Sequence, residues 1–464
     1  RTREPTGTPS PSPFPTFTLT SLPTRAPTSL PTSPSTRQPT PTLTTVPSTP
    51  AVGKPLDFSL GWQFSGFGHL ADGVVTLRDG WPVSVVASLA RQIYALTRTG
   101  QVLWRAQAAG PAYVLAVLGG GQVAVGDDAG HITVFDDQGR RLWQPELGGR
   151  VTALRGDWQG GLLAGGWDER LTFLENHAGG ERVRWQADLV GPLSGIAALS
   201  GPPGQSLALA ATLEGDLRAF KTTGAEQWRF DAGVAVTGLG TVSGENAELV
   251  LIGLQDGRLL ALEPGEGPPR LRWQRELGLG GPVWHVANLV GDVELEIVAG
   301  TGGEAPSLTL LSVHGEPMWR VATPAAVNAL AVVDLDGDGP LEILAGLASG
   351  EIQAYDGQGR LRGSIHAGLP VWGLQPSEDG TVLALADVVA WQVSGQAGPA
   401  GEPWLPAPSL VPLPLQSSPL PAGWEAKSQA SRGEAILAFL GDVTPGRSME
   451  TQLIRYGAAF PWQG

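Results

Sequence analysis

The stretch HITVFDDQGRRLW, residues 131–143, is the pattern that this chain repeats. It predicts a short strand over residues 131–135, a turn rich in Asp and Gly, and a second strand that ends at Trp143. Two strands joined in this way are typical of a β-hairpin. A further copy, residues 351–363, has Gly363 in the place of the tryptophan. Related phrases end at Trp104, Trp185, Trp228, Trp273 and Trp319.

The copies recur at a nearly constant interval, because successive closing tryptophans are 39 to 46 residues apart. A period of about 40–45 residues with about four short strands is the signature of propeller blades. The copies predict seven blades, and residues 369–395 add three strands of an eighth. Residues 57–67, DFSLGWQFSGF, are a lone strand without a blade.

We therefore predict an all-β, eight-bladed β-propeller over residues 57–396. The strand at 57–67 would pair with the last three strands and close the ring, which places Trp62 near Trp391. Such closure removes the exposed sheet edges that otherwise promote aggregation.

The composition changes on both sides of the repeats. The first fifty residues contain 15 Thr, 13 Pro and 7 Ser, which predicts a disordered, extended stalk over residues 1–56 that is also suited to O-glycosylation. Residues 397–433 form a Pro-rich linker. Residues 434–464 predict a strand, a turn and a helix, the truncated start of an α/β domain.

Charge and cysteine content exclude several classes of function. The formal charge is −14 with only three lysines, which argues against nucleic acid or an anionic membrane surface as a partner. Cys is 0, so there is no disulfide or thiol chemistry. No apolar run approaches the roughly 18 residues of a membrane span. We expect a monomeric, exported propeller at the cell surface or outside the cell, without membrane insertion within this chain.

The tryptophans divide into two groups. For those that close the repeats, we predict that each large indole packs between neighbouring blades. Trp81, Trp158, Trp167, Trp284 and Trp372 stand outside the period and are better candidates for contact with a ligand. Of these, Trp284 and Trp372 open the first strand of their blades, in the phrases PVWHVA and PVWGLQ. Because innermost strands line the centre of a propeller, contact with a ligand stays open for these two. The closing residues are Trp62, Trp104, Trp143, Trp185, Trp228, Trp273 and Trp319.

The repeat resembles the tryptophan-docked repeats of the pyrroloquinoline-quinone-like propeller family. The matching features are the Ala-x-Asp-type strand end, the glycine and the closing tryptophan, as in residues 135–143 and 354–359. The resemblance implies an eight-bladed scaffold more than an activity. Members that oxidise alcohols carry an adjacent cysteine pair over the quinone, and this chain has none, so we do not expect the quinone as a cofactor.

One blade contains VVDLDGDGPLEILAG, residues 332–346. Asp334, Asp336 and Asp338 alternate around two glycines, and Glu342 follows. Calcium takes six to eight oxygen ligands, and this spacing predicts several carboxylates around one point. The loop resembles the Asp-x-Asp-Gly-Asp-Gly loop of integrin-type calcium-binding propeller repeats, which implies a structural Ca²⁺ ion. An acidic turn without an ion is the alternative.

The last segment resembles the opening of the CapA family of capsule and poly-γ-glutamate synthesis proteins, which are related to metallophosphoesterases. The resemblance implies that Asp442 is a metal ligand in a site that is incomplete here, and it leaves open whether the whole domain is an enzyme. A stray strand-turn-helix tail is the alternative. The matching positions are the apolar strand at 435–440, Gly441, Asp442, Gly446, Arg447, Tyr456, Pro461 and Trp462.

No nucleophile elbow, phosphate loop or zinc-helix motif occurs in the propeller. The first hypothesis is thus a non-catalytic binding or scaffold module, with a protein or a cell-surface polysaccharide or polymer as its partner. It would be attached to a CapA-like domain for polymer synthesis. A quinone-dependent or sugar-oxidising propeller enzyme is one alternative. A calcium-stabilised adhesion propeller is the other.

Overall fold

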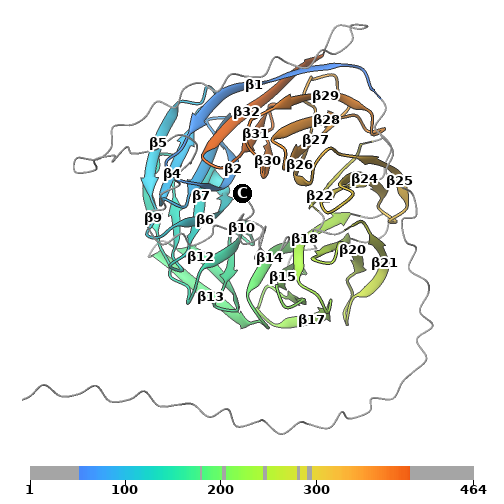
Figure 1. Cartoon of the computed structure of the whole chain (residues 1–464). Helices are drawn as coiled ribbons and strands as arrows, with labels where there is room; N and C mark the ends of the chain where they lie inside the picture. The colour runs from blue at the N-terminus through green and yellow to red at the C-terminus, as the bar shows by residue number, and fades with distance from the viewer. Residues whose placement is uncertain are drawn as a thin grey trace, which may run out of the picture. The chain divides into compact units, whose positions relative to one another are not determined.

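The computed structural model describes residues 52–177, 180–200, 205–243, 248–278, 283–289 and 295–397. Within these ranges the chain forms eight four-stranded antiparallel sheets arranged as a ring (Figure 1). This arrangement confirms the predicted all-β, eight-bladed propeller. The stalk up to residue 51, the linker after residue 397 and the CapA-like segment with Asp442 lie outside the described residues.

The first four blades in chain order are each built from four consecutive strands, numbered from the centre of the ring outwards. They are β2 (Leu70–Arg78), β3 (Trp81–Ser88), β4 (Gln92–Leu96) and β5 (Val102–Gln107); β6 (Ala112–Leu118), β7 (Gln122–Asp127), β8 (Ile132–Phe135) and β9 (Arg141–Trp143); β10 (Val151–Trp158), β11 (Gly161–Gly166), β12 (Arg170–His177) and β13 (Gly180–Asp188); and β14 (Leu193–Leu199), β15 (Leu207–Thr212), β16 (Asp216–Phe220) and β17 (Glu226–Asp231).

Blades five to seven repeat this plan, whereas the eighth combines strands from both ends of the ring. They are β18 (Val236–Ser243), β19 (Glu248–Leu254), β20 (Arg258–Glu263) and β21 (Arg270–Glu276); β22 (Val283–Ala287), β23 (Glu296–Gly300), β24 (Ser307–Ser312) and β25 (Pro317–Ala322); β26 (Val327–Val333), β27 (Glu342–Leu347), β28 (Glu351–Tyr355) and β29 (Leu361–His366); and β30 (Gly373–Pro376), β31 (Val382–Leu385), β32 (Val389–Ala397) and β1 (Leu56–Ser65).

Helical structure is almost absent from the described residues. It consists there of η1 (Gly119–Gly121), one 3₁₀ turn between β6 and β7. The described part of the chain therefore contains no helix with the length and apolar character needed to span a membrane.

The hairpin formed by β8 and β9 shows why the repeated phrase folds as it does. The Asp136 carboxylate accepts hydrogen bonds from the backbone N–H groups of Gln138 and Arg140, at 3.0 and 2.8 Å. Gly139 has a φ of +75°, a conformation that side chains with a Cβ rarely adopt. The Asp and the Gly of the phrase therefore fix the turn, and the two strands follow on either side of it.

The ring closes by strand exchange between its two ends. β1 pairs antiparallel with β32, from Leu56 opposite Ala397 to Ser65 opposite Val389. Gln63, the neighbour of Trp62, is the residue opposite Trp391, which confirms the predicted closure. Figure 1 shows β1 running along β32 at the outside of the eighth blade.

The chain just before β1 also contacts the seventh blade. Val52 bridges Leu361 in parallel, and Gly53 donates its N–H to the carbonyl of Leu361 at 2.8 Å. Phe58, which is 6% exposed, lies where a side chain at Gly363 would point, because a Cβ there would be 3.0 Å from its ring. The phenyl ring thus covers the position at which the repeat lacks its tryptophan.

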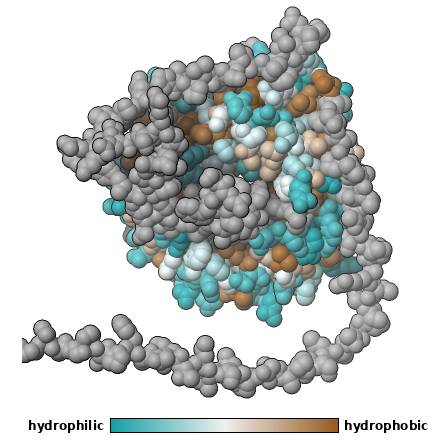
Figure 2. Space-filling view, in the orientation of Figure 1, coloured by the Kyte–Doolittle hydropathy of each residue, from teal (hydrophilic) through white to brown (hydrophobic). Residues whose placement is uncertain are grey.

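The apolar core is divided into clusters that each combine residues of neighbouring blades. One of them joins Leu209 and Ala211 of the fourth blade to Val250 and Ile252 of the fifth. Figure 2 shows hydrophobic residues in separate patches among hydrophilic ones on the face in view. Burial between blades, rather than within one sheet, therefore provides most of the hydrophobic stabilisation.

Alternating strand direction gives the ring two different faces. The turn face carries the connections between first and second and between third and fourth strands, including Trp81 and the Asp334 loop. The loop face carries the connections between second and third strands and between blades, including Trp167. Because β1 begins and β32 ends at the turn face, Leu56 and Ala397 lie side by side there.

Replacing Leu56 by Ala should destabilise the propeller by about 2–5 kcal/mol, because the side chain is 1% exposed in the closing strand. The matched control is Leu77→Ala, whose side chain is 40% exposed and should cost less than about 1 kcal/mol. Urea unfolding followed by circular dichroism measures both. Equal midpoints for the two variants would contradict the role of β1 in closing the ring.

Candidate functional site

Four closing tryptophans make one recurring contact with the next blade. The Trp104 indole donates its Nε1–H to the carbonyl of Asp137 at 3.0 Å. A Cβ at Gly139 would lie 2.7 Å from the Trp104 ring, so only glycine allows this approach. The same pair of contacts is made by Trp185 with Thr222 and Gly224, by Trp273 with Val313 and Gly315, and by Trp319 with Gly357 and Gly359.

The other closing tryptophans depart from this geometry. Trp62 lies against Gly100, where a Cβ would be 2.6 Å from its ring. Trp143 and Trp228 are 6% and 3% exposed. Within the described ranges, the Nε1 atoms of all three have no hydrogen-bond partner. Their indoles therefore contribute packing without the hydrogen bond.

The two tryptophans considered as ligand contacts lie against protein. Trp284 crosses the neighbouring innermost strand β18, because a Cβ at Gly240 would be 2.3 Å from its ring. Trp372 stacks on His69 with ring centres 5.9 Å apart, where the eighth blade meets the first. Both rings are half-buried, so most of their apolar surface is used between blades.

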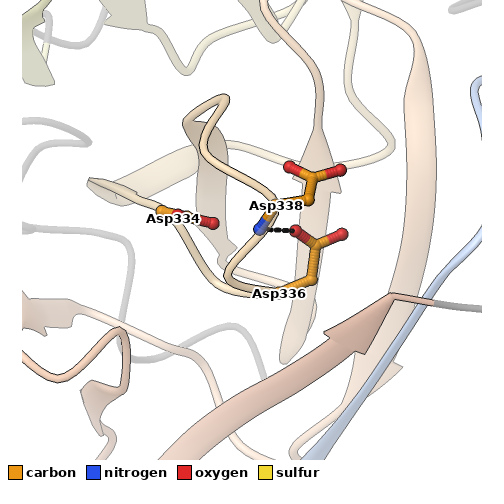
Figure 3. Close-up of side chains that lie close together, drawn as sticks. All are labelled: Asp334, Asp336 and Asp338. Atoms are coloured by element: carbon orange, nitrogen blue, oxygen red, sulfur yellow. Dashed lines mark hydrogen bonds between the residues drawn. The ribbon is translucent and has the colours of Figure 1, made fainter.

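The Asp334 loop connects β26 and β27 on the turn face. One oxygen each of Asp334, Asp336 and Asp338 can be chosen so that all three lie within 4.8 Å of one another. Figure 3 shows these three side chains around the loop, with the Asp338 N–H donating to Asp336 at 3.1 Å. Asp334 accepts from the Gly339 N–H at 3.0 Å. The loop thus gathers three carboxylates, as its spacing predicts.

The fourth predicted ligand, Glu342, is held elsewhere. Its carboxylate accepts from the Leu335 N–H at 2.8 Å and from the Arg362 guanidinium. Arg362 also donates to Asp336 at 2.7 Å and to the Lys54 carbonyl at 3.1 Å. The sequence analysis did not identify Arg362, which stands next to Gly363 in the repeat that lacks its tryptophan.

The charges of this loop fit one more cation. Four carboxylates face two basic side chains, Arg362 and Lys54, and Lys54 is 3.9 Å from Asp338. Burial and then the neighbouring Asp336 raise the pKa of Asp338, because a second negative charge is unfavourable there. Burial of Asp336 acts to raise its pKa, but the Arg362 guanidinium outweighs this effect and lowers the pKa of Asp336.

One oxygen of the loop is left for a ligand. Oδ1 of Asp334 is buried and has no hydrogen-bond partner among the described residues. Oxygen donors of this kind suit Ca²⁺. The residues present therefore fit an ion held by Asp334, Asp336 and Asp338, with Glu342 bound to Arg362 instead.

The loop face carries an aromatic cluster of which the sequence analysis singled out only Trp167. The Arg150 guanidinium lies over two rings, 4.7 Å from the centre of Tyr113 and 5.4 Å from that of Trp167. It also pairs with Asp128, and Trp167 remains 49% exposed. These residues come from different blades, so no short sequence motif contains all of them. The signal available in the sequence was that Trp167 lies outside the period of the closing tryptophans.

The family model for outer membrane protein assembly factor BamB matches residues 59–159 and 130–298. Together these matches extend over residues 59–298, which is more than half of the chain. The chain belongs to this family. The matched region of the BamB family runs from β1 into the sixth blade. No curated protein matches the chain.

Solved structures agree with this fold. The chain is similar to BamB from Moraxella catarrhalis, with a TM-score of 0.55, 15% identity, and coverage of 73% of this chain and 100% of that one. It is also similar to Sqt1 of Saccharomyces cerevisiae, with a TM-score of 0.59, 11% identity, and coverage of 72% and 99%. At these identities the likeness concerns the fold alone.

Replacing Trp104 by Ala should cost about 3–5 kcal/mol of stability, since it removes packing and a hydrogen bond between two blades. The matched control is Trp81→Ala on the turn face, whose indole is 60% exposed, and it should cost less than about 1 kcal/mol. Urea unfolding of the two variants provides the comparison. A Trp104 variant as stable as the control would refute a blade-joining role.

Calcium should bind to the chelator-treated protein with one ion per chain in isothermal titration calorimetry. Asp338→Ala should abolish the heat of binding, because it removes a ligand without leaving Arg362 unpaired. Asp336→Ala should abolish it too. Asp188→Asn, at a side chain 86% exposed in another blade, is the control and should bind as the natural protein does. Absence of binding heat in the natural protein would exclude the ion.

Proposed function

We propose that this chain is an exported, non-catalytic propeller that serves as a binding or scaffold module, with the loop face as its binding surface. Membership of the family described as outer membrane protein assembly factor BamB supports a role in assembly at the cell envelope. It also favours the periplasm or the cell surface as its location. Its binding partner in this role is a protein.

The aromatic cluster on the loop face is the observation that carries this proposal. Trp is among the residues that most often dominate binding energy at protein interfaces, and Trp167, 49% exposed, is the ring that would meet a partner, because Tyr113 is 2% exposed. Here Arg150 holds both rings in place, so little side-chain freedom is lost on binding. Val190, 55% exposed, lies on this face in the loop after the third blade, where the neighbouring Leu189 donates its N–H to the Glu169 carbonyl in the Trp167 loop at 2.7 Å. The cluster is therefore a preformed anchor.

The described chain ends lie on the face opposite the cluster. Leu56 and Ala397 pair at the turn face, so the flanking segments join the ring on the side opposite Trp167. In this proposal the stalk and the CapA-like domain are both attached at the turn face, next to one another. In this proposal residues 434–464 begin a domain for capsule or poly-γ-glutamate synthesis, and Asp442 is one of its metal ligands.

A photo-crosslinking amino acid at position 190 should form one discrete adduct in the cells that produce this protein. The matched control is position 183, a valine 48% exposed on the outer strand of the third blade, which should form none. Trp167→Ala should reduce the adduct at least about fivefold, since an interface anchor contributes more than 1 kcal/mol. Equal crosslinking from both positions, or none from 190, would contradict the loop-face proposal.

A further inference from the structure

A polar cleft opens on the turn face where the seventh, eighth and first blades meet. Its volume is about 450 Å³, which lies within the range of about 300–1,000 Å³ typical of small-molecule sites. Leu335 supplies the apolar part of its wall. The polar side chains that line it are Asp57, Ser59, Arg98, Asp379, Thr381 and Ser394.

The cleft depends on close backbone contacts behind it. A Cβ at Gly380 would lie 2.8 Å from the carbonyl oxygen of Asp334, and a Cβ at Gly395 would lie 2.9 Å from the Leu335 side chain. These two glycines let the Asp334 loop press against the eighth blade. The polar side chains of the cleft therefore stand on a packed support.

Its donors and acceptors are already oriented. The Asp379 carboxylate accepts from the Thr381 hydroxyl at 2.6 Å and lies 3.0 Å from Nε of Arg98. Burial of Asp379 acts to raise its pKa, but these hydrogen bonds and the Arg98 charge outweigh this effect and lower the pKa of Asp379. Arg98 in turn lies over the ring of Trp81, 5.7 Å from its centre. A charged, hydrogen-bonded edge thus stands beside an exposed indole.

The charge balance restricts the ligand. Asp57 and Asp379 are negative and Arg98 is positive, so the lining has one net negative charge. Arg98 is already paired with Asp379, and the whole chain carries −14. Phosphates, uronates and other anions are therefore disfavoured. Three hydroxyls, two carboxylates and a guanidinium instead match a neutral ligand that is rich in hydroxyl groups.

We infer that this cleft binds neutral saccharide residues. A pyranose ring carries hydroxyls around its edge and an apolar face of C–H groups. The hydroxyls would bond to Asp379, Thr381 and Ser394, while the apolar face would pack on Trp81, an exposed indole that adjoins the cleft wall through its contact with Arg98. This site lies on the face opposite the aromatic cluster of Arg150, so it is separate from the proposed protein-binding surface.

Saturation-transfer NMR of the full chain with maltotriose, cellotriose and N-acetylated chitotriose, each tested alone, examines the inference. At least one of these neutral trisaccharides should give signals. Trp81→Ala and Thr381→Val should each reduce those signals at least about fivefold. Ser59→Trp should abolish them, because Ser59 is exposed on β1 and an indole there would fill the cleft.

Ser65→Trp is the matched control, since Ser65 is exposed on the same strand but lies at its loop-face end. This variant should bind as the natural protein does, and thermal unfolding should show both tryptophan variants folded. The inference is overturned if no neutral trisaccharide gives a signal, if Ser59→Trp retains it, or if trigalacturonate binds and the neutral probes do not. None of these results would bear on crosslinking from position 190.

Discussion

Antiparallel pairing of the two ends of the ring is the constraint on which this propeller depends. Without β1, the eighth blade would contain only β30, β31 and β32, and the outer edge of β32 would be unpaired. β1 covers that edge along its whole length. Leu56 and Ala397 therefore lie next to one another at the turn face. The hydrogen bonds between β1 and β32 thus close the ring and also place the two described chain ends on the face opposite the loop face.

The contacts between blades explain how one motif can build a large ring. Each blade is a small sheet with little core of its own, and in five of the eight blades an indole pressed against a glycine joins it to the next. The seventh blade departs from this rule. Gly363 replaces the tryptophan there, and Phe58 and the buried Arg362 take over the joint. The irregular repeat therefore coincides with the place where the first strand has to enter, and the departure from the motif serves ring closure.

The same irregular joint brings polar chemistry to one side of the molecule. The Asp334 loop, Arg362 and the polar cleft all lie where the last two blades meet the first, whereas the Arg150 cluster occupies the other face. Burial of an arginine requires carboxylate partners, and Asp336 and Glu342 provide them. A family relationship through the repeats does not specify either surface, because function in propellers resides in the loops and turns.

The sequence by itself determined the repeat, the number of blades, the closing strand and the grouping of Asp334, Asp336 and Asp338. These features depend on local periodicity and on short-range turn chemistry, such as Asp136 and Gly139, which the chain carries in order. Only the tertiary structure decided that Glu342 faces Arg362, that Phe58 covers Gly363, and that Tyr113, Arg150 and Trp167 meet. Those contacts join residues from different strands or blades, and no pattern along the chain encodes which side chains the closed ring brings together.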